Sequence, residues 1–426
     1  MRRDRRVGRR AVLGAGVGIA GSWAVGGASA AMAAGRSYRV VATPLGQARG
    51  VPYAQSVMDC DRWGRALVGA RFDSDSDSVV GAVWDGEELT ALAPPPSSTY
   101  VSASAMNDRN QILGTASGSG SVSRPVIWTR GVPEVLDLDT NAWGNHINNR
   151  GEVLFTVREG NYARRSTRLY RSGEVIPVSP PPESPFSDVE PRGFNDSGQV
   201  ALLAYDEYPE SLGTVFLWQD GAARELPLPG EERARVAVRA FNARGDILGS
   251  HYASGRERQW LWRDGELIEF PLAGAGAFRA AWGGQALNSR GQVLGAACPS
   301  GDAADWGPAL WSPDGVELLP FPDGVSAYAN AINDRGDVAG TLQSPDGAER
   351  ACLWRGGRLI DLGVPEGFGG ARGYWIAADG GVFGTAQASN HPENETEEVH
   401  AFHWRVRGCA PPPDMGDRAH HGARRA

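Results

Sequence analysis

A nine-residue phrase recurs along this 426-residue chain, and its clearest copy runs from Ile332 to Gly340 as Ile-Asn-Asp-Arg-Gly-Asp-Val-Ala-Gly. Five further copies are centred on an asparagine, and two weaker ones lie around residues 61–64 and 377–380. The five asparagines are Asn107, Asn148, Asn195, Asn242 and Asn288. The glycine-equivalent positions of successive copies are 41 to 47 residues apart. That period is typical of a four-stranded propeller blade or a pair of helices, so the chain is a repeat protein.

The residue pattern inside one period favours strands over helices. In the seventh repeat, short apolar runs at residues 328–332, 337–341, 351–355 and 358–363 are separated by Gly, Asp or Asn. No stretch keeps the 3.6-residue apolar spacing of an amphipathic helix. The sequence therefore predicts an all-β fold, a β-propeller. Eight four-stranded blades are favoured, and seven is the alternative if the first repeat is irregular.

The two ends of the chain are predicted to meet in the last blade. The eighth repeat has a third strand at His400–Trp404 but no clear fourth strand. The segment from Tyr38 to Leu45 resembles the fourth strands of other repeats, such as Leu359–Gly363. We expect this N-terminal strand to complete the eighth blade, which would close the ring and remove an exposed sheet edge.

One large aromatic residue stands at the same place in every third strand. These residues are Trp84, Trp128, Tyr170, Trp218, Trp262, Trp311, Trp354 and Trp404. A ladder of rings that stacks on a ligand is one interpretation. Burial of one ring per blade is favoured, because an aromatic side chain packed between sheets removes roughly 150–250 Å² from water.

The first 30 residues are predicted to be a twin-arginine signal peptide. Arg9 and Arg10 precede an apolar stretch that ends at Val25, and Ala28-Ser29-Ala30 is a small-residue cleavage site. A transmembrane anchor is the alternative, disfavoured because the apolar stretch is short and rich in glycine. We therefore expect a secreted, extracellular protein. Its propeller repeat domain would span residues 31–410, with a disordered tail at 411–426.

The charge of the chain excludes some partners. Removal of residues 1–30 leaves 36 basic and 49 acidic side chains, a net charge of −13. A surface this acidic disfavours nucleic acid and anionic membranes, because both repel negative charge. We expect a monomer that does not insert into a membrane after cleavage.

The sequence gives little support for a metal, a cofactor or a disulfide framework. Cys60, Cys298, Cys352 and Cys409 match no zinc-site spacing. A disulfide between Cys60 and Cys409 near the ring seam is one hypothesis, and free thiols are the other. The acidic run at residues 73–77 lacks the glycine and the glutamate of a calcium-binding loop. No cofactor and no metal are predicted.

The repeated phrase resembles that of the bacterial extracellular HAF-repeat proteins. The third strand His400-Ala401-Phe402-His403-Trp404 and the closing Leu359-Ile360-Asp361-Leu362-Gly363 also match that family. The resemblance covers nearly the whole chain after residue 30, although only the last repeat keeps His-Ala-Phe. It implies secretion and a repeated β fold. It implies no agreed activity, so no catalytic residue is carried over.

Any binding site is predicted on the face that holds the irregular connections. In a propeller the second-to-third strand connections and the links between blades share one face, and irregular loops on a rigid scaffold commonly bind ligands. Seven of the eight repeats place an aromatic residue near the start of the first strand. The candidate ligand-binding residues are Tyr100, Trp143, His146, Trp282, Tyr328, Arg372 and Trp375, with Arg192, Arg239 and Arg279 as further polar candidates. The rings would stack on a sugar, a planar cofactor or a peptide, or they would pack on one another and fill the channel.

Three classes of function stay open from the sequence. The favoured one is a secreted binding or interaction module for a glycan, cell-wall or protein ligand. The second is a secreted propeller enzyme, a lyase or a quinone- or metal-dependent oxidoreductase, which rests on fold analogy alone. The third is a structural cell-surface protein. The chain lacks a zinc-binding His-Glu-x-x-His and a Gly-x-Ser-x-Gly nucleophile motif, so catalytic residues are unknown and catalysis is disfavoured.

Overall fold

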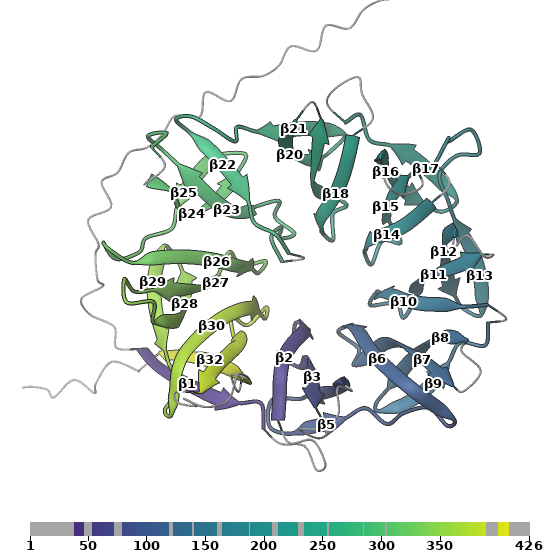
Figure 1. Ribbon diagram of the computed structural model, residues 1–426, viewed down its shortest axis with the longest axis horizontal. Helices are drawn as coiled ribbons and strands as arrows, with labels where there is room; N and C mark the ends of the chain where they lie inside the picture. The colour runs from purple at the N-terminus through teal and green to yellow at the C-terminus, as the bar shows by residue number, and fades with distance from the viewer. Residues whose placement is uncertain are drawn as a thin grey trace, which may run out of the picture.

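The computed structural model consists of short antiparallel strands arranged around a central axis (Figure 1). It describes residues 38–46, 53–71, 79–118, 122–138, 140–159, 164–186, 188–206, 212–228, 234–253, 255–283, 285–302, 305–388 and 399–408. The predicted signal peptide, the acidic run at 73–77, Cys409 and the predicted C-terminal tail all lie outside these residues. No described helix is long and apolar enough to cross a membrane.

Each sequence repeat supplies a unit of strands that pair with their neighbours in chain order, and we number these units 1 to 8. Units 1 and 2 contain β2 (Tyr53–Cys60), β3 (Ala66–Arg71), β4 (Val79–Trp84) and β5 (Leu89–Ala91), then β6 (Ser98–Met106), β7 (Gln111–Gly118), β8 (Ser123–Thr129) and β9 (Val132–Val135). Units 3 and 4 contain β10 (Ala142–Ile147), β11 (Val153–Glu159), β12 (Arg164–Arg171) and β13 (Glu174–Val178), then β14 (Asp188–Phe194), β15 (Val200–Tyr205), β16 (Leu212–Gln219) and β17 (Ala222–Glu225).

The second half of the chain continues the same order. Units 5 and 6 contain β18 (Ala234–Phe241), β19 (Ile247–Ala253), β20 (Arg256–Arg263) and β21 (Glu266–Phe270), then β22 (Ala277–Ala280), β23 (Val293–Cys298), β24 (Gly307–Ser312) and β25 (Gly315–Leu318). Unit 7 contains β26 (Ser326–Ile332), β27 (Val338–Gln343), β28 (Glu349–Arg355) and β29 (Arg358–Gly363). Unit 8 contains β30 (Phe368–Ile376), β31 (Val382–Ala388) and β32 (Val399–Gly408), together with β1 (Tyr38–Pro44) from the start of the chain.

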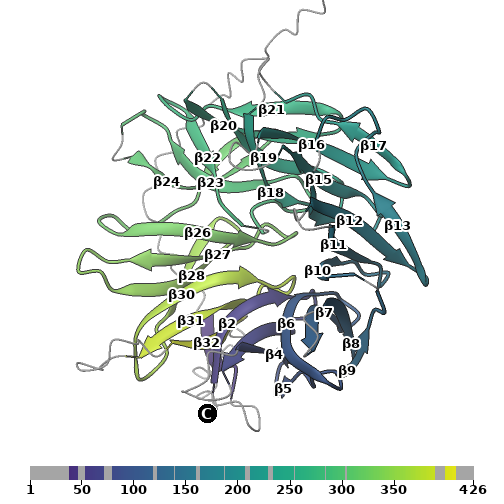
Figure 2. The ribbon, with the colours of Figure 1, turned by 45° about the vertical axis from the view of Figure 1, so that its right-hand side comes forward.

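The strands form seven sheets, because units 4 and 5 share one sheet of eight strands. Only two residue pairs, Leu212 with Arg235 and Gly213 with Ala234, join β16 to β18 within it. Counted as separate sheets the number is therefore seven, the alternative count from the sequence, although the strands fall into eight four-stranded units, the last of which is completed by β1. The predicted β-propeller architecture is confirmed (Figures 1 and 2).

The N-terminal strand pairs with the last strand of the chain, as predicted. β1 is antiparallel to β32, from Tyr38 opposite Gly408 to Pro44 opposite Phe402. A hydrophobic cluster then joins the first and last units: Trp84 of unit 1 packs with Phe383 of unit 8, at 5.8 Å between ring centroids. The same cluster includes Leu45, which follows β1 and is fully buried.

The repeated phrase forms the tight turn between the first and second strands of each unit. In the seventh unit the Asn333 Oδ1 accepts hydrogen bonds from the backbone N–H groups of Arg335 and Asp337, both at 3.0 Å. Gly336 has a φ of +82°, a left-handed conformation that glycine adopts without steric cost. The only non-glycine at this place is Asn110, with a φ of +60°, and asparagine tolerates this region better than most residues.

The same asparagine side chains also connect neighbouring units, which the sequence did not suggest. The Asn288 Nδ2 donates to the carbonyl of Asn333 at 3.0 Å, and the Asn333 Nδ2 donates to Ala377 at 3.0 Å. Equivalent bonds run from Asn107, Asn148, Asn195 and Asn242 to the next turn. Asparagine is suited to this position because its amide both accepts from its own turn and donates to the next.

The third-strand rings are buried, as favoured from the sequence. Trp128, Trp354 and Trp404 are at most 1% exposed, and Tyr170 is half-buried. The last glycine of the phrase makes room for them: a Cβ on Gly114 would lie 2.8 Å from the Trp128 ring. These tryptophans are core residues and cannot form a ligand ladder.

Most first strands carry a one-residue bulge three positions before the turn residue. Ser104, Arg239 and Asn330 are the bulged residues of units 2, 5 and 7. Each of these side chains donates to a first-strand carbonyl of the next unit, and the Asn330 Nδ2 bond to Gly373 is 2.7 Å long. In these three units the bulge therefore directs one polar side chain toward the next unit.

The cysteines bear on the disulfide hypothesis. Cys60, Cys298 and Cys352 have free thiols in the structure, and Cys409, the suggested partner of Cys60, lies outside the described residues. Burial raises the pKa of the Cys60 and Cys352 thiols, which keeps both in the unreactive protonated form.

Candidate functional site

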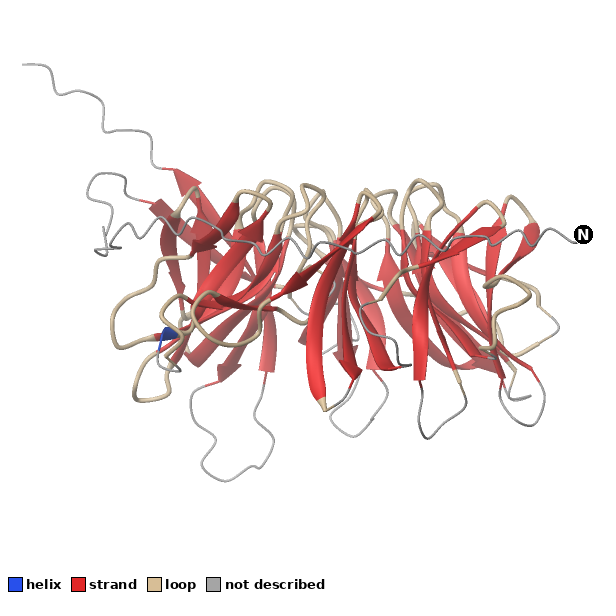
Figure 3. Ribbon diagram, turned by 90° about the horizontal axis from the view of Figure 1, so that it is seen from above, coloured by secondary structure: helices blue, strands red, loops and turns tan. Residues whose placement is uncertain are grey.

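Two cavities open among the inner strands on the face that carries the irregular connections. The turns of the repeated phrase line the opposite face, and Figure 3 shows the two faces edge-on. The larger cavity, of about 760 Å³, lies between units 5, 6 and 7, and the smaller, of about 460 Å³, between units 3 and 4. Both are lined by residues near the start of first and third strands, where the second-to-third connections and inter-unit links meet.

The larger cavity depends on an interruption in the first strand of unit 6. β22 ends at Ala280, and pairing with β23 resumes only at the isolated bridge between Leu287 and Val293. Leu294 bonds to both Ala281 and Ala286, so the residues between those two leave the ladder. Trp282 stands on this excursion and is 70% exposed. No other described unit departs from the one-residue bulge in this way.

The interruption also brings unit 6 into contact with unit 8. Gln285, on the same excursion, reaches unit 8, where its Nε2 donates to the Ile376 carbonyl at 3.1 Å and its Oε1 accepts from the Ile376 N–H at 3.0 Å. These bonds hold the excursion against a unit two places further along the ring. They therefore hold Gln285, three residues after Trp282, in a defined position.

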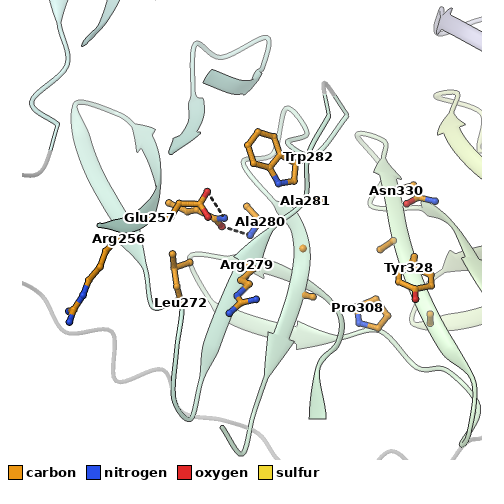
Figure 4. Close-up of a pocket in the computed structure, with 15 residues that line it drawn as sticks. Arg256, Glu257, Leu272, Arg279, Ala280, Ala281, Trp282, Pro308, Tyr328 and Asn330 are labelled. Carbon is orange, nitrogen blue, oxygen red and sulfur yellow. Dashed lines mark hydrogen bonds between the residues drawn. The ribbon is translucent and has the colours of Figure 1, made fainter. Parts of the chain in front are cut away.

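Two aromatic rings and several polar groups converge on the larger cavity (Figure 4). Trp282 and Tyr328, both predicted ligand-binding residues, line it from units 6 and 7, and Tyr328 is 51% exposed. Arg279 extends from β22 into the same space and lies 4.6 Å from the centroid of the Trp306 ring. Asn330 adds a polar group from unit 7, and Arg256, Glu257 and Gln259 add polar groups from unit 5.

A buried arginine beneath Trp282 sets the orientation of that ring. The Arg239 guanidinium lies 3.5 Å from the centroid of Trp282 and its side chain is only 1% exposed. It forms an ion pair with Glu257 and donates to the Ala280 carbonyl at 3.1 Å. Burial lowers the pKa of Arg239, and the Glu257 carboxylate opposes that shift. Arg239 therefore supports the ring from below and leaves the other face of Trp282 open.

Two other predicted residues, Trp143 and Arg192, line the smaller cavity. The predicted His146 forms a hydrogen bond to the backbone of Pro191, which also lines the cavity. Burial, with the nearby Arg192 charge, lowers the pKa of His146 to about 4, so this imidazole is neutral at physiological pH. Arg158 covers the Trp143 ring at 5.4 Å from its centroid.

The remaining predicted residues are dispersed. Tyr100 is 59% exposed on β6 and lines neither of the two cavities. Arg372 forms an ion pair with Glu349, a hydrogen bond that raises the pKa of its guanidinium. Trp375 packs against the hydrophobic cluster between units 1 and 8. The seven candidates therefore form no single site, and Trp282 with Tyr328 is the one aromatic pair that shares a cavity.

Sequence reasoning missed Glu257 and Asn330 as lining residues. Glu257 lies near the start of a third strand, and a bulge directs Asn330 toward the neighbouring unit. Among the described residues no group of three His, Cys, Asp or Glu side chains could hold a metal ion.

Comparisons with known proteins leave the function open. No family model matches the chain, and no curated protein matches it. The β-propeller domain of the Trilobed protease from Pyrococcus furiosus is 9% identical with a TM-score of 0.45, over 73% of this chain and 96% of that one. The Dos1 propeller is 10% identical with a TM-score of 0.46, over 85% and 94%.

A third solved structure is a peptidase that carries more than this fold. A puromycin-hydrolyzing peptidase from Mycobacterium tuberculosis is 11% identical with a TM-score of 0.47, and the match covers 79% of this chain. This chain spans 58% of the length of that peptidase. At these identities and TM-scores the likeness says nothing about the function of this chain.

Proposed function

We propose that this protein is a binding module that holds a saccharide in the cavity between units 5, 6 and 7. The observation that carries the proposal is the pairing of two exposed rings, Trp282 and Tyr328, on neighbouring units of one cavity. Pyranose rings present apolar C–H faces with hydroxyl groups around the edge, and a stacking ring flanked by hydrogen-bonding groups matches that chemistry.

The polar lining suits a neutral sugar better than an apolar ligand. Glu257 and Asn330 contribute acceptor and donor groups, and Arg279 contributes donors from the floor. A volume of about 760 Å³ accommodates two to three sugar rings, since pockets of roughly 300–1,000 Å³ hold small ligands. The support of Trp282 by Arg239 reduces the ordering cost of binding, because the ring is held in place before the ligand arrives.

The test is calorimetric titration with two neutral oligosaccharides, chitohexaose and cellohexaose. We expect saturable binding of one of them, and a loss of at least about 30-fold in affinity for Trp282→Ala, since truncation of a central aromatic contact costs about 2 kcal/mol or more. Tyr328→Ala should weaken binding in the same direction.

A matched control is available on the opposite face. Trp63 is 67% exposed, close to the 70% of Trp282, but it lies in the first repeat turn and donates its Nε1–H to Asp108. Trp63→Ala should leave the affinity unchanged. Equal losses in Trp63→Ala and Trp282→Ala, or no binding of either oligosaccharide, would reject the proposal.

We also propose that the module acts outside the cell, after export directed by residues 1–30. The support is the Arg9-Arg10 pair, the apolar stretch and the Ala28-Ser29-Ala30 site in the sequence. N-terminal sequencing of protein from the culture medium should give a chain that begins near Ala31. Replacement of Arg9 and Arg10 by lysine should retain the protein in the cell, and unchanged secretion of that variant would contradict the export route.

A further inference from the structure

The cavity between units 3 and 4 is lined by a larger excess of arginine side chains over carboxylates than the saccharide cavity. Three arginines and one glutamate line it: Arg158, Arg165, Arg192 and Glu190. Its side chains therefore carry two more positive than negative charges, although the whole chain has a net charge of −8. A local excess of guanidinium groups in an acidic protein needs an explanation beyond solubility.

Ion pairs within the cavity neutralise only part of the positive charge of these arginines. Glu190 pairs with both Arg165 and Arg192, and the Tyr205 hydroxyl donates to its Oε1 at 2.8 Å. One carboxylate therefore serves two guanidinium groups and a hydroxyl. Asp188, just outside the lining, accepts from the backbone N–H of Arg165 at 2.8 Å. No carboxylate in the described residues forms an ion pair with Arg158.

Arg192 of unit 4 differs in its contacts from Arg239, the residue at the equivalent position of unit 5. Arg192 and Arg239 are both the bulged residues of their first strands. Arg239 is 1% exposed and donates to the next unit, so its role is structural. Arg192 keeps 44% of its side chain exposed and bonds to Glu190 on its own strand. The repeat scaffold therefore does not require the orientation of Arg192.

The guanidinium groups are also crowded together. Burial lowers the pKa of Arg192, and the positive charge of Arg165 acts in the same direction. An oxyanion placed between these groups would relieve that repulsion and accept two-pronged hydrogen bonds from the planar guanidinium forks. His146, which borders the cavity, is neutral and adds no competing charge.

We propose that the cavity lined by Arg158, Arg165 and Arg192 is a binding site for an oxyanion, a carboxylate or phosphate group on a small ligand. The Trp143 ring lies at the edge of the site, where Arg158 covers it, and would contact the body of the ligand that carries the anion. The volume of about 460 Å³ fits one monosaccharide-sized group. This site is separate from Trp282 and Tyr328 and does not depend on the saccharide proposal.

Calorimetric titration with inorganic phosphate and with glucuronate, at low ionic strength, tests the proposal and separates the two sources of the oxyanion. We expect saturable one-site binding of at least one probe. The double variant Arg158→Gln with Arg192→Gln should weaken it at least about tenfold, which equals about 1.4 kcal/mol. The control is Arg350→Gln, because Arg350 is similarly exposed at 47% but pairs with Asp361 on the outer strands of unit 7.

Each outcome decides the proposal. Equal weakening in the double variant and in Arg350→Gln would mean non-specific attraction, and no saturable binding of either probe would also overturn it. If the double variant fails to fold, Arg158→Gln alone is sufficient, because that exposed side chain has no ion-pair partner among the described residues. Trp282→Ala should leave anion binding intact, so failure of the saccharide proposal is distinguishable from failure of this one.

Discussion

A buried histidine at the junction between the first and last units should make the free energy of unfolding of this protein depend on pH. His403 of β32 stacks on Phe383 with ring centroids 4.3 Å apart and meets the edge of Trp84 from unit 1 at 4.9 Å. His403 as a whole is only 1% exposed to solvent. Burial, with a smaller contribution from Arg405 and against the attraction of Asp379, lowers the pKa of His403 to about 4 from its usual 6.5.

The sign of the effect follows from proton binding in the two states. Between pH 6.5 and about 4 the unfolded chain protonates this imidazole and the folded chain does not, so the free energy of unfolding falls as the pH falls. The contribution lost between pH 7.5 and pH 4.5 is about 2.5 kcal/mol, since each unit of pKa difference is worth about 1.4 kcal/mol.

The perturbation is His403→Leu, because leucine occupies the equivalent third-strand position in units 5 and 7, at Leu261 and Leu353. Guanidinium unfolding of both proteins at pH 7.5 and at pH 4.5 gives the measurement. The variant should lose about 2.5 kcal/mol less than the parent between the two pH values. His146 titrates in both proteins and cancels in the comparison. Parallel pH profiles for parent and variant would refute the reasoning.

Four further predictions concern the scaffold. Asn288→Asp keeps the oxygen that accepts hydrogen bonds in its own turn but loses the amide that donates to Asn333; Asp61 has this arrangement naturally in unit 1. The variant should lower the free energy of unfolding by about 1–3 kcal/mol, measured with a denaturant. An unchanged unfolding midpoint would contradict a stabilising role for the inter-unit bonds. Gly340→Ala should destabilise the fold by about 2 kcal/mol or more, because its Cβ would press on the Tyr328 carbonyl and the Trp354 ring; thermal unfolding measures it. Deletion of residues 38–45 removes the partner of β32 and should lower the melting temperature and promote self-association, seen by light scattering. Burial raises the pKa of Asp59 to about 6, so its ionisation should cost at most about 3 kcal/mol as the pH rises from 4 to above 6, and Asp59→Asn should remove that pH dependence.

The propeller was predictable because each repeat contains the short phrase that forms the turn between its first and second strands. The strands at Arg358–Gly363 and around Tyr328 fall where the apolar runs indicated, and the N-terminal strand pairs with β32 as expected. The number of separate sheets was not predictable, since it depends on two residue pairs between β16 and β18 that local pattern does not specify.

The candidate binding sites were harder to predict from the sequence, because bulges determine where the first-strand side chains point. A one-residue bulge turns Asn330 and Arg239 toward the next unit, and periodicity alone cannot locate such a register shift. Trp375 and Trp282 were both predicted to bind a ligand, as aromatic residues near the first strands of their repeats. The first packs in the core between units 1 and 8, whereas an excursion that breaks the strand exposes the second.

The proposed binding role depends on the open face of the Trp282 ring. The most direct test therefore monitors Trp282 while the ligand is added. Protein labelled with 5-fluorotryptophan gives separate fluorine resonances for its tryptophans, and spectra of Trp282→Phe and Trp63→Phe assign two of them. On titration with chitohexaose or cellohexaose, the Trp282 resonance should shift and saturate at the calorimetric affinity, while that of Trp63 should stay in place. Saturable binding that leaves the Trp282 resonance unmoved, or no shift with either oligosaccharide, would contradict the proposed saccharide site.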